Sequence, residues 1–120
     1  MEHRARTIGL ASLRFMLLKV SPKNDMMFDP ADSVSFDGDT GARVLYAYAR
    51  LRTMINDAAD ETPPDELALT VLTHENERNL ALSILSFSGT TARAARDLNP
   101  SVIASFLIEL VRDLNRFYDR

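Results

Sequence analysis

Residues 99–118 read NPSVIASFLIELVRDLNRFY, and this stretch decides the fold of the chain. Its apolar residues recur at spacings of four, three, four and three, which is the period of one helical face. They are Ile103, Leu107, Leu110, Leu114 and Phe117. Asn99 is a good N-cap, and Pro100 suits the first helical position. The sequence therefore predicts a long helix here that packs through this apolar stripe.

The N-terminal half predicts two more helices separated by a loop. Residues 4–20 predict a helix whose apolar stripe includes Ile8, Ala11, Phe15 and Leu18. Ser21-Pro22 ends the pattern because a residue before proline avoids the α region. Residues 23–39 are rich in Asp, Ser and Pro and predict an ordered loop, with a short extended piece around residues 26–28. Thr40 is expected to cap a second helix that runs to about Ala59.

The middle of the chain predicts a boundary followed by shorter helices. Residues 57–64 are acidic and end in two prolines, so they are expected to link two domains, 1–60 and 65–120. Residues 65–71 predict a short helix, and Thr73 is expected to cap the next one. Ser88-Gly89 is expected to interrupt that helix before a further one over residues 90–98. The predicted fold is all-α, with five or six helices.

The composition limits the possible functions. The net charge is −3, whereas nucleic-acid-binding domains are usually basic, so any RNA-binding surface has to be local. The chain contains no cysteine, which excludes disulfides and cysteine-based sites and favours a reducing cytoplasm. The apolar runs are far too short to cross a membrane, and no apolar segment of a signal peptide follows the charged start.

The sequence predicts no metal site. The two histidines, His3 and His74, lie far apart, and the acidic residues of the first loop lack the spacing of a calcium-binding loop. Residues 38–41, Gly-Asp-Thr-Gly, allow two interpretations. They can cradle a phosphate at a helix N-terminus, or they can form a tight turn and helix cap.

Two features of the last helix suit RNA. Arg112, Arg116 and Arg120 step by four and share one face, although ion pairs with Glu109 and Asp113 would also explain them. A tyrosine at the exposed end of a helix can stack on a base and bind its edge. Tyr118 has this position, and the alternative is a half-buried residue at a helix end.

Two motifs resemble the arginyl-tRNA synthetase family. Residues 35–41, SFDGDTG, with residues 46–52, YAYARLR, are similar to the family pattern G-(N/D)-T-G-P-(Y/F)-x-Q-Y-(A/T)-x-(A/S)-R. Residues 99–118 resemble the signature P-x-x-(L/V)-x-x-Y-L-x-x-L…N-x-F-Y of the family's helical anticodon-binding domain. The likeness extends from about Ile8 to Tyr118. Ala42-Arg43 replaces a proline and an aromatic residue of the pattern, and Leu45 replaces its usual glutamine.

The resemblance implies a helical bundle of the class I synthetase anticodon-binding type over residues 65–120, preceded by a helical connection from the catalytic core over residues 1–60. It implies tRNA recognition, with tRNA and the rest of a synthetase chain as partners. It implies no binding to DNA or to a membrane. The residues that it implies as tRNA contacts are Tyr118, Asn115, Arg116, Arg112, Arg120, Tyr46 and Arg50.

The same resemblance predicts no catalysis by this chain alone. The family joins arginine to tRNA with ATP through a nucleotide-binding fold that carries a HIGH-type motif and usually a KMSK-like loop, and neither is found in this sequence. We therefore expect a piece of a longer synthetase, with no cofactor of its own. The alternative is a stand-alone helical module derived from this family that docks a protein and does not bind RNA.

Overall fold

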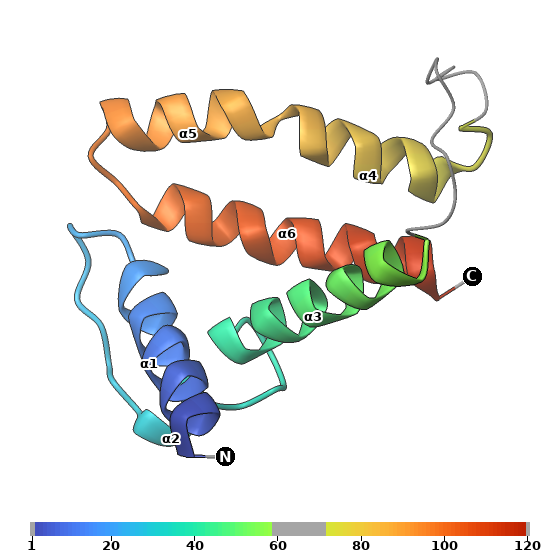
Figure 1. The fold of residues 1–120 in the computed structure, drawn as a ribbon. Coiled ribbons are helices and arrows are strands. Elements are labelled where there is room, and N and C mark those ends of the chain that lie inside the picture. The colour runs from blue at the N-terminus through green and yellow to red at the C-terminus, as the bar shows by residue number, and fades with distance from the viewer. Residues whose placement is uncertain (1, 59–71, 120) are drawn as a thin grey trace.

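The computed structural model describes residues 2–58 and 72–119, and these residues form helices joined by loops (Figure 1). The helices are α1 (Glu2–Leu18), α2 (Pro30–Ser33), α3 (Gly41–Asp57), α4 (Glu75–Leu85), α5 (Phe87–Arg96) and α6 (Ser101–Tyr118). The predicted all-α fold is confirmed. Most of the predicted linker and the predicted helix over 65–71 lie outside the described residues. None of the described helices combines the length and the apolar character that a membrane span requires.

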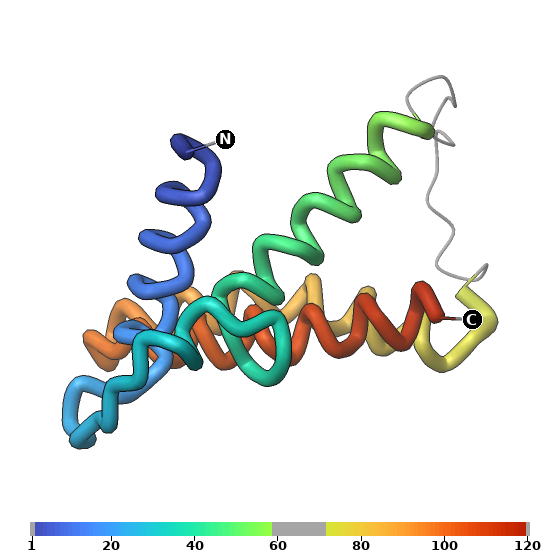
Figure 2. The backbone as a smooth tube through the Cα atoms, turned by 90° about the horizontal axis from the view of Figure 1, so that it is seen from below, coloured from blue at the N-terminus to red at the C-terminus, as the bar shows by residue number. Residues whose placement is uncertain are grey.

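Helix α6 is the centre of the arrangement. Helices α4 and α5 follow one another along one side of it and run antiparallel to it, while α1 and α3 contact it from the other side (Figure 1). Figure 2 shows that α3 crosses near the middle of α6 and then diverges, so that its C-terminal half projects away.

The core of the molecule lies where the two sides meet on α6. Ala47 of α3 is buried with Val111 and Leu114 of α6, and Leu80 of α4 packs against the same cluster. Helix α6 therefore joins the segments before and after residues 59–71 through a shared set of apolar contacts.

The predicted stripe of α6 is wrong in one respect. Its fully buried residues are Ala104, Ile108, Val111 and Leu114, so Leu114 alone belongs to both sets. The other stripe residues are partly buried. A helix that is packed on two sides buries residues from both faces, whereas a periodicity argument selects one face. The same correction applies to α1, which buries Ser12 and Met16 while Ile8 and Leu18 of the predicted stripe are exposed.

The start of α3 follows the prediction and explains a glycine. Thr40 is the N-cap, and its hydroxyl oxygen accepts a hydrogen bond from Arg43 N at 3.3 Å. A side chain at Gly41 would place its Cβ 2.8 Å from both Ser12 Cα and Phe15 Cβ of α1. Such a distance is shorter than real Cβ contacts allow, so the crossing of α1 and α3 requires a glycine here. Gly38 has a φ of +79°, which a turn can use at little cost with glycine.

Several helix boundaries differ from those predicted. The one-turn helix α2 was not predicted, although Asp29 caps it and Pro30 starts it. His74, and not Thr73, is the N-cap of α4, because Glu77 stands three residues after His74 and completes a capping box with it.

Two further boundaries lie near the predicted ones. Helix α4 gives way to α5 at Ser86, and Gly89 lies inside α5, where nothing lies within 4 Å of the position that a Cβ would take. Helix α6 begins at Ser101, while Asn99 Oδ1 accepts hydrogen bonds from Ser101 N and Oγ as a cap does.

Candidate nucleic-acid interface

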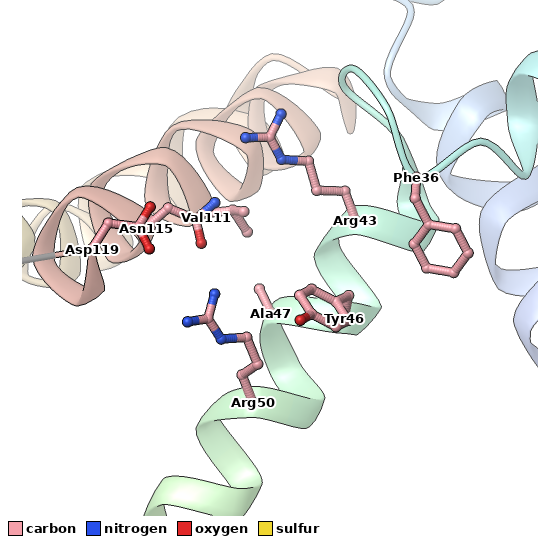
Figure 3. Close-up of a pocket in the computed structure, with 8 residues that line it drawn as sticks. All are labelled: Phe36, Arg43, Tyr46, Ala47, Arg50, Val111, Asn115 and Asp119. Carbon is pink, nitrogen blue, oxygen red and sulfur yellow. The ribbon is translucent and has the colours of Figure 1, made fainter.

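A hollow of about 580 Å³ lies where α3 diverges from α6 (Figure 3). Its base includes the buried side chains of Ala47 and Val111, which bring the two helices close together. The residues that line it are Phe36, Arg43, Tyr46, Ala47, Arg50, Val111, Asn115 and Asp119. Apart from Ala47 and Val111, these side chains are aromatic, charged or amide groups.

The helical period explains which residues of α3 reach the hollow. Arg43, Tyr46 and Arg50 follow at intervals of three and four residues and therefore share one face of the helix. In Figure 3 the guanidinium groups of Arg43 and Arg50 extend toward α6. Asn115 and Asp119, four residues apart, form the opposite wall.

Tyr118 and Arg50 are in direct contact. The guanidinium carbon of Arg50 lies 3.7 Å from the ring centroid of Tyr118 and 5.9 Å from that of Tyr46. A cation at this distance from an aromatic face is attracted by the ring quadrupole. Tyr118 is 48% exposed, so the arginine covers part of the ring and the remainder is open to solvent. The structure thus combines the two alternatives, because Tyr118 is both packed and accessible.

Arg112 and Arg116, two of the three arginines that were predicted to share a face of the last helix, do not line the hollow. Arg112 Nη2 lies 2.9 Å from each carboxylate oxygen of Asp39, and Arg112 also contacts Glu109. Arg116 pairs with Asp113 at 3.1 Å, and its side chain is 64% exposed. The ion-pair alternative of the sequence analysis is therefore observed for both. Arg120 lies outside the described residues.

Four of the predicted contact residues come together at the hollow: Tyr46, Arg50, Asn115 and Tyr118. Sequence reasoning missed Phe36, Arg43 and Asp119. Phe36 stands inside a motif that was singled out, and its 64% exposure is unusual for a phenylalanine. Arg43 could have been found from its position three residues before Tyr46, on the same helical face.

The charge of the hollow differs from that of the chain. Two arginines, Arg43 and Arg50, face a single lining carboxylate, Asp119, although the whole chain has a net charge of −3. Arg43 Nη1 also donates a hydrogen bond to the Gly38 carbonyl at 3.4 Å. In the described part of the chain, no group of three or more His, Asp or Glu side chains is placed to hold a metal ion. The chemistry present is stacking, amide hydrogen bonding and guanidinium binding of anions.

Comparison with known proteins gives a consistent family assignment. Residues 44–120 match the model of a family described as the DALR anticodon binding domain. The chain is 36% identical over 119 residues to an arginine–tRNA ligase of Parabacteroides distasonis, which covers 98% of this chain and 20% of that protein. It is 36% identical over 115 residues to the arginine–tRNA ligase of Flavobacterium psychrophilum, which covers 94% of this chain and 18% of that protein.

A solved structure agrees with these relatives. The Thermus thermophilus arginyl-tRNA synthetase superposes with a TM-score of 0.88 at 34% sequence identity, over 99% of this chain and 20% of that one. The chain thus spans about a fifth of the length of the relatives that it matches. The likeness drawn from the two sequence motifs is confirmed.

Proposed function

Because this chain belongs to the DALR anticodon binding domain family, we propose that it recognises tRNA as part of an arginyl-tRNA synthetase. The observation that carries the proposal is the hollow between α3 and α6. It places the ring of Tyr46 and the amide of Asn115 around one space, with Tyr118 beneath Arg50 at its side. Single-stranded RNA is recognised by this combination, because its unstacked bases lie on aromatic rings while amides bind their edges.

The proposal assigns separate tasks to the residues of the hollow. Tyr46 and Tyr118 offer aromatic surfaces for bases, and Asn115 has both a donor and an acceptor for a base edge. Arg50 and Arg43 can bind phosphate oxygens with their forked donors. Arg43 stands where the family pattern has an aromatic residue, so in this chain one aromatic surface is replaced by a cation.

The remainder of a synthetase chain is the second proposed partner. Helix α1 and the loop after it expose apolar side chains that a packed domain normally covers. They are Ile8, Leu10, Leu17, Leu18, Met27 and Phe28. Since the relatives are about five times longer, we propose that another part of the synthetase packs here. The joining of arginine to tRNA with ATP would belong to that part, acting in the cytoplasm.

The test of the proposal is a binding titration with three RNAs at low salt. Labelled tRNA that accepts arginine is expected to bind. An isolated anticodon stem-loop is expected to compete with it for binding, whereas a duplex of the same length without a loop is not expected to compete. If two arginines neutralise phosphates of a single strand, the slope of log K against log salt should be roughly −1.4. Equal competition by loop and duplex would contradict recognition of a single strand.

The competing function is a helical module that docks a protein through its apolar faces. The exposed side chains of α1 and of the loop after it favour that alternative as much as they favour contact with a synthetase body. The same titration separates the two functions. Absence of tRNA binding at low salt, from a chain whose helices are intact by circular dichroism, would favour the protein-docking module.

A further inference from the structure

An ion pair joins two segments that lie 73 residues apart in the sequence. Arg112, in the middle of α6, donates from Nη2 to both carboxylate oxygens of Asp39 at 2.9 Å, while its Nη1 contacts Glu109, so the guanidinium is held by two carboxylates at once. Asp39 directly precedes Thr40, the N-cap of α3. The pair therefore ties the beginning of α3 to α6.

The turn that carries Asp39 is bound from two other elements. Lys19, just after α1, donates a hydrogen bond from Nζ to the Asp39 carbonyl at 3.1 Å, and Arg43 of α3 donates to the Gly38 carbonyl at 3.4 Å. With Arg112, three cationic side chains hold residues 38–39. The position of Asp39 is thus well defined relative to α1, α3 and α6.

Besides the close packing of Gly41 against α1, two contacts with α6 restrict the direction of α3. One is the buried packing of Ala47 against Val111. The other is the Asp39–Arg112 pair, which lies in the turn just before α3 begins. With the packing contact alone, α3 could pivot about it. With both contacts, the separation of Arg50 from Tyr118 is set.

We propose that the Asp39–Arg112 pair positions α3 relative to α6 and thereby sets the shape of the hollow between them, an inference that rests on the proposed function. Arg112 then acts on tRNA through the orientation of α3, and its side chain does not need to touch a phosphate. Both side chains are partly exposed, at 38% for Arg112 and 45% for Asp39. A pair with that exposure contributes little to overall stability, so its loss should change the angle between the helices without unfolding them.

Replacement of Asp39 distinguishes a positioning role from a simple effect of charge, because the two predict opposite changes in the affinity for tRNA. Asp39→Asn removes a negative charge and releases Arg112, so simple electrostatics predicts tighter tRNA binding. Positioning predicts weaker binding, by roughly three- to ten-fold. The matched control is Asp37→Asn, which removes the same charge from the same exposed loop; in the described structure the Asp37 carboxylate forms no ion pair. The control should bind tRNA as tightly as the unaltered chain, or more tightly.

A second measurement reports on the hollow without RNA. The side-chain protons of Arg50 lie over the Tyr118 ring, so the ring current should shift their NMR resonances upfield. The upfield shift should disappear in Tyr118→Leu, which verifies the assignment. It should also be reduced in Asp39→Asn and in Arg112→Lys, which keeps the charge but replaces the two terminal nitrogens that bind Asp39 and Glu109 separately with a single nitrogen. Arg116→Lys, which alters an exposed pair outside the hollow, should leave the shift unchanged.

The outcomes separate the two proposals. Failure of the unaltered chain to bind tRNA would contradict the proposed function, whereas the NMR comparison would still test the positioning. Full retention of the Arg50 shift in both Asp39→Asn and Arg112→Lys would overturn the inference. Tighter tRNA binding by Asp39→Asn, equal to that of Asp37→Asn, would overturn it as well.

Discussion

Tyr118 shows how a single residue can be packed and available at the same time. The Arg50 guanidinium lies 3.7 Å from the centroid of its ring, and about half of the side chain remains exposed. A base can therefore stack on the open part of the ring or take the place of the guanidinium. In either case the proposed interaction would use mainly the aromatic surface and not the hydroxyl.

Substitution of Tyr118 tests this assignment. Tyr118→Ala should weaken tRNA binding by about 1–3 kcal/mol, which is the usual value of one base–aromatic stack. Tyr118→Phe keeps the ring and should retain most of the affinity. Fluorescence anisotropy with labelled tRNA measures both, and circular dichroism verifies that α6 is intact. If Tyr118→Ala binds as well as the unaltered chain, no base lies on this ring.

Gly41 is expected to be the glycine least tolerant of substitution. Gly41→Ala would press a Cβ against backbone and side-chain atoms of α1 at 2.8 Å, so α1 and α3 would have to separate. We expect a loss of about 1–3 kcal/mol in the free energy of unfolding. The matched control is Gly89→Ala inside α5, where nothing lies within 4 Å and alanine should stabilise by about 0.5–1 kcal/mol. The midpoint of urea unfolding, followed by circular dichroism, should fall for Gly41→Ala and rise for Gly89→Ala. A rise in both variants would contradict the close helix crossing.

The difference between local and distant contacts explains what could be predicted for individual residues. The cap at Thr40 depends on a neighbour three residues away, and the sequence predicts it correctly. Arg112 pairs with Glu109, as its spacing of three residues predicts, but its second partner, Asp39, could not be predicted because it lies far away in the sequence. The tight contact of Gly41 with Ser12 likewise arises only when two helices cross.

At the scale of the helices, periodicity predicted their existence and type better than their faces and ends. The helices over residues 4–20 and 41–59 were predicted to within about two residues of α1 and α3. Helix α2 was missed because a single helical turn is too short to contain a repeating pattern of apolar residues. The stripe of α6 was misassigned since a central helix contacts partners on both sides, and sequence alone does not tell how many partners a helix has.

The capping of α4 gives a prediction at this scale. His74 Nδ1 accepts a hydrogen bond from Asn76 N at 3.1 Å, and the Glu77 carboxylate accepts one from His74 N at 3.1 Å. His74→Ala should therefore lower the free energy of unfolding by about 0.5–2 kcal/mol. His74→Asp should restore or exceed the original value, because a carboxylate both caps and favours the positive end of the helix dipole. Thermal unfolding provides the measurement, and the same substitutions at Thr73 should have little effect.

For the whole molecule, net charge is a poor guide to the site. The chain has 17 acidic and 14 basic residues, which predicts weak affinity for RNA when the charges are averaged over the surface. The fold brings Arg43 and Arg50 together beside a single lining carboxylate. The sequence could predict that an RNA surface has to be local, but its place depends on the divergence of α3 from α6, which no local pattern determines.

The division into two domains at residues 57–64 can be tested through the core that both parts share. The buried cluster joins Ala47 of α3 to Val111 and Leu114 of α6, and Leu80 of α4 packs on it, so the contacts cross the division. A shared core predicts that both parts unfold together. Leu114→Ala should cost about 2–5 kcal/mol, and native-state hydrogen exchange should report the same loss for the slowest amides of α3 and of α4. As a control, Leu82→Ala on the exposed face of α4 should leave both sets of amides nearly unchanged. If Leu114→Ala accelerates exchange in α4 and leaves α3 at its original rate, the two parts fold independently and the division into domains is correct.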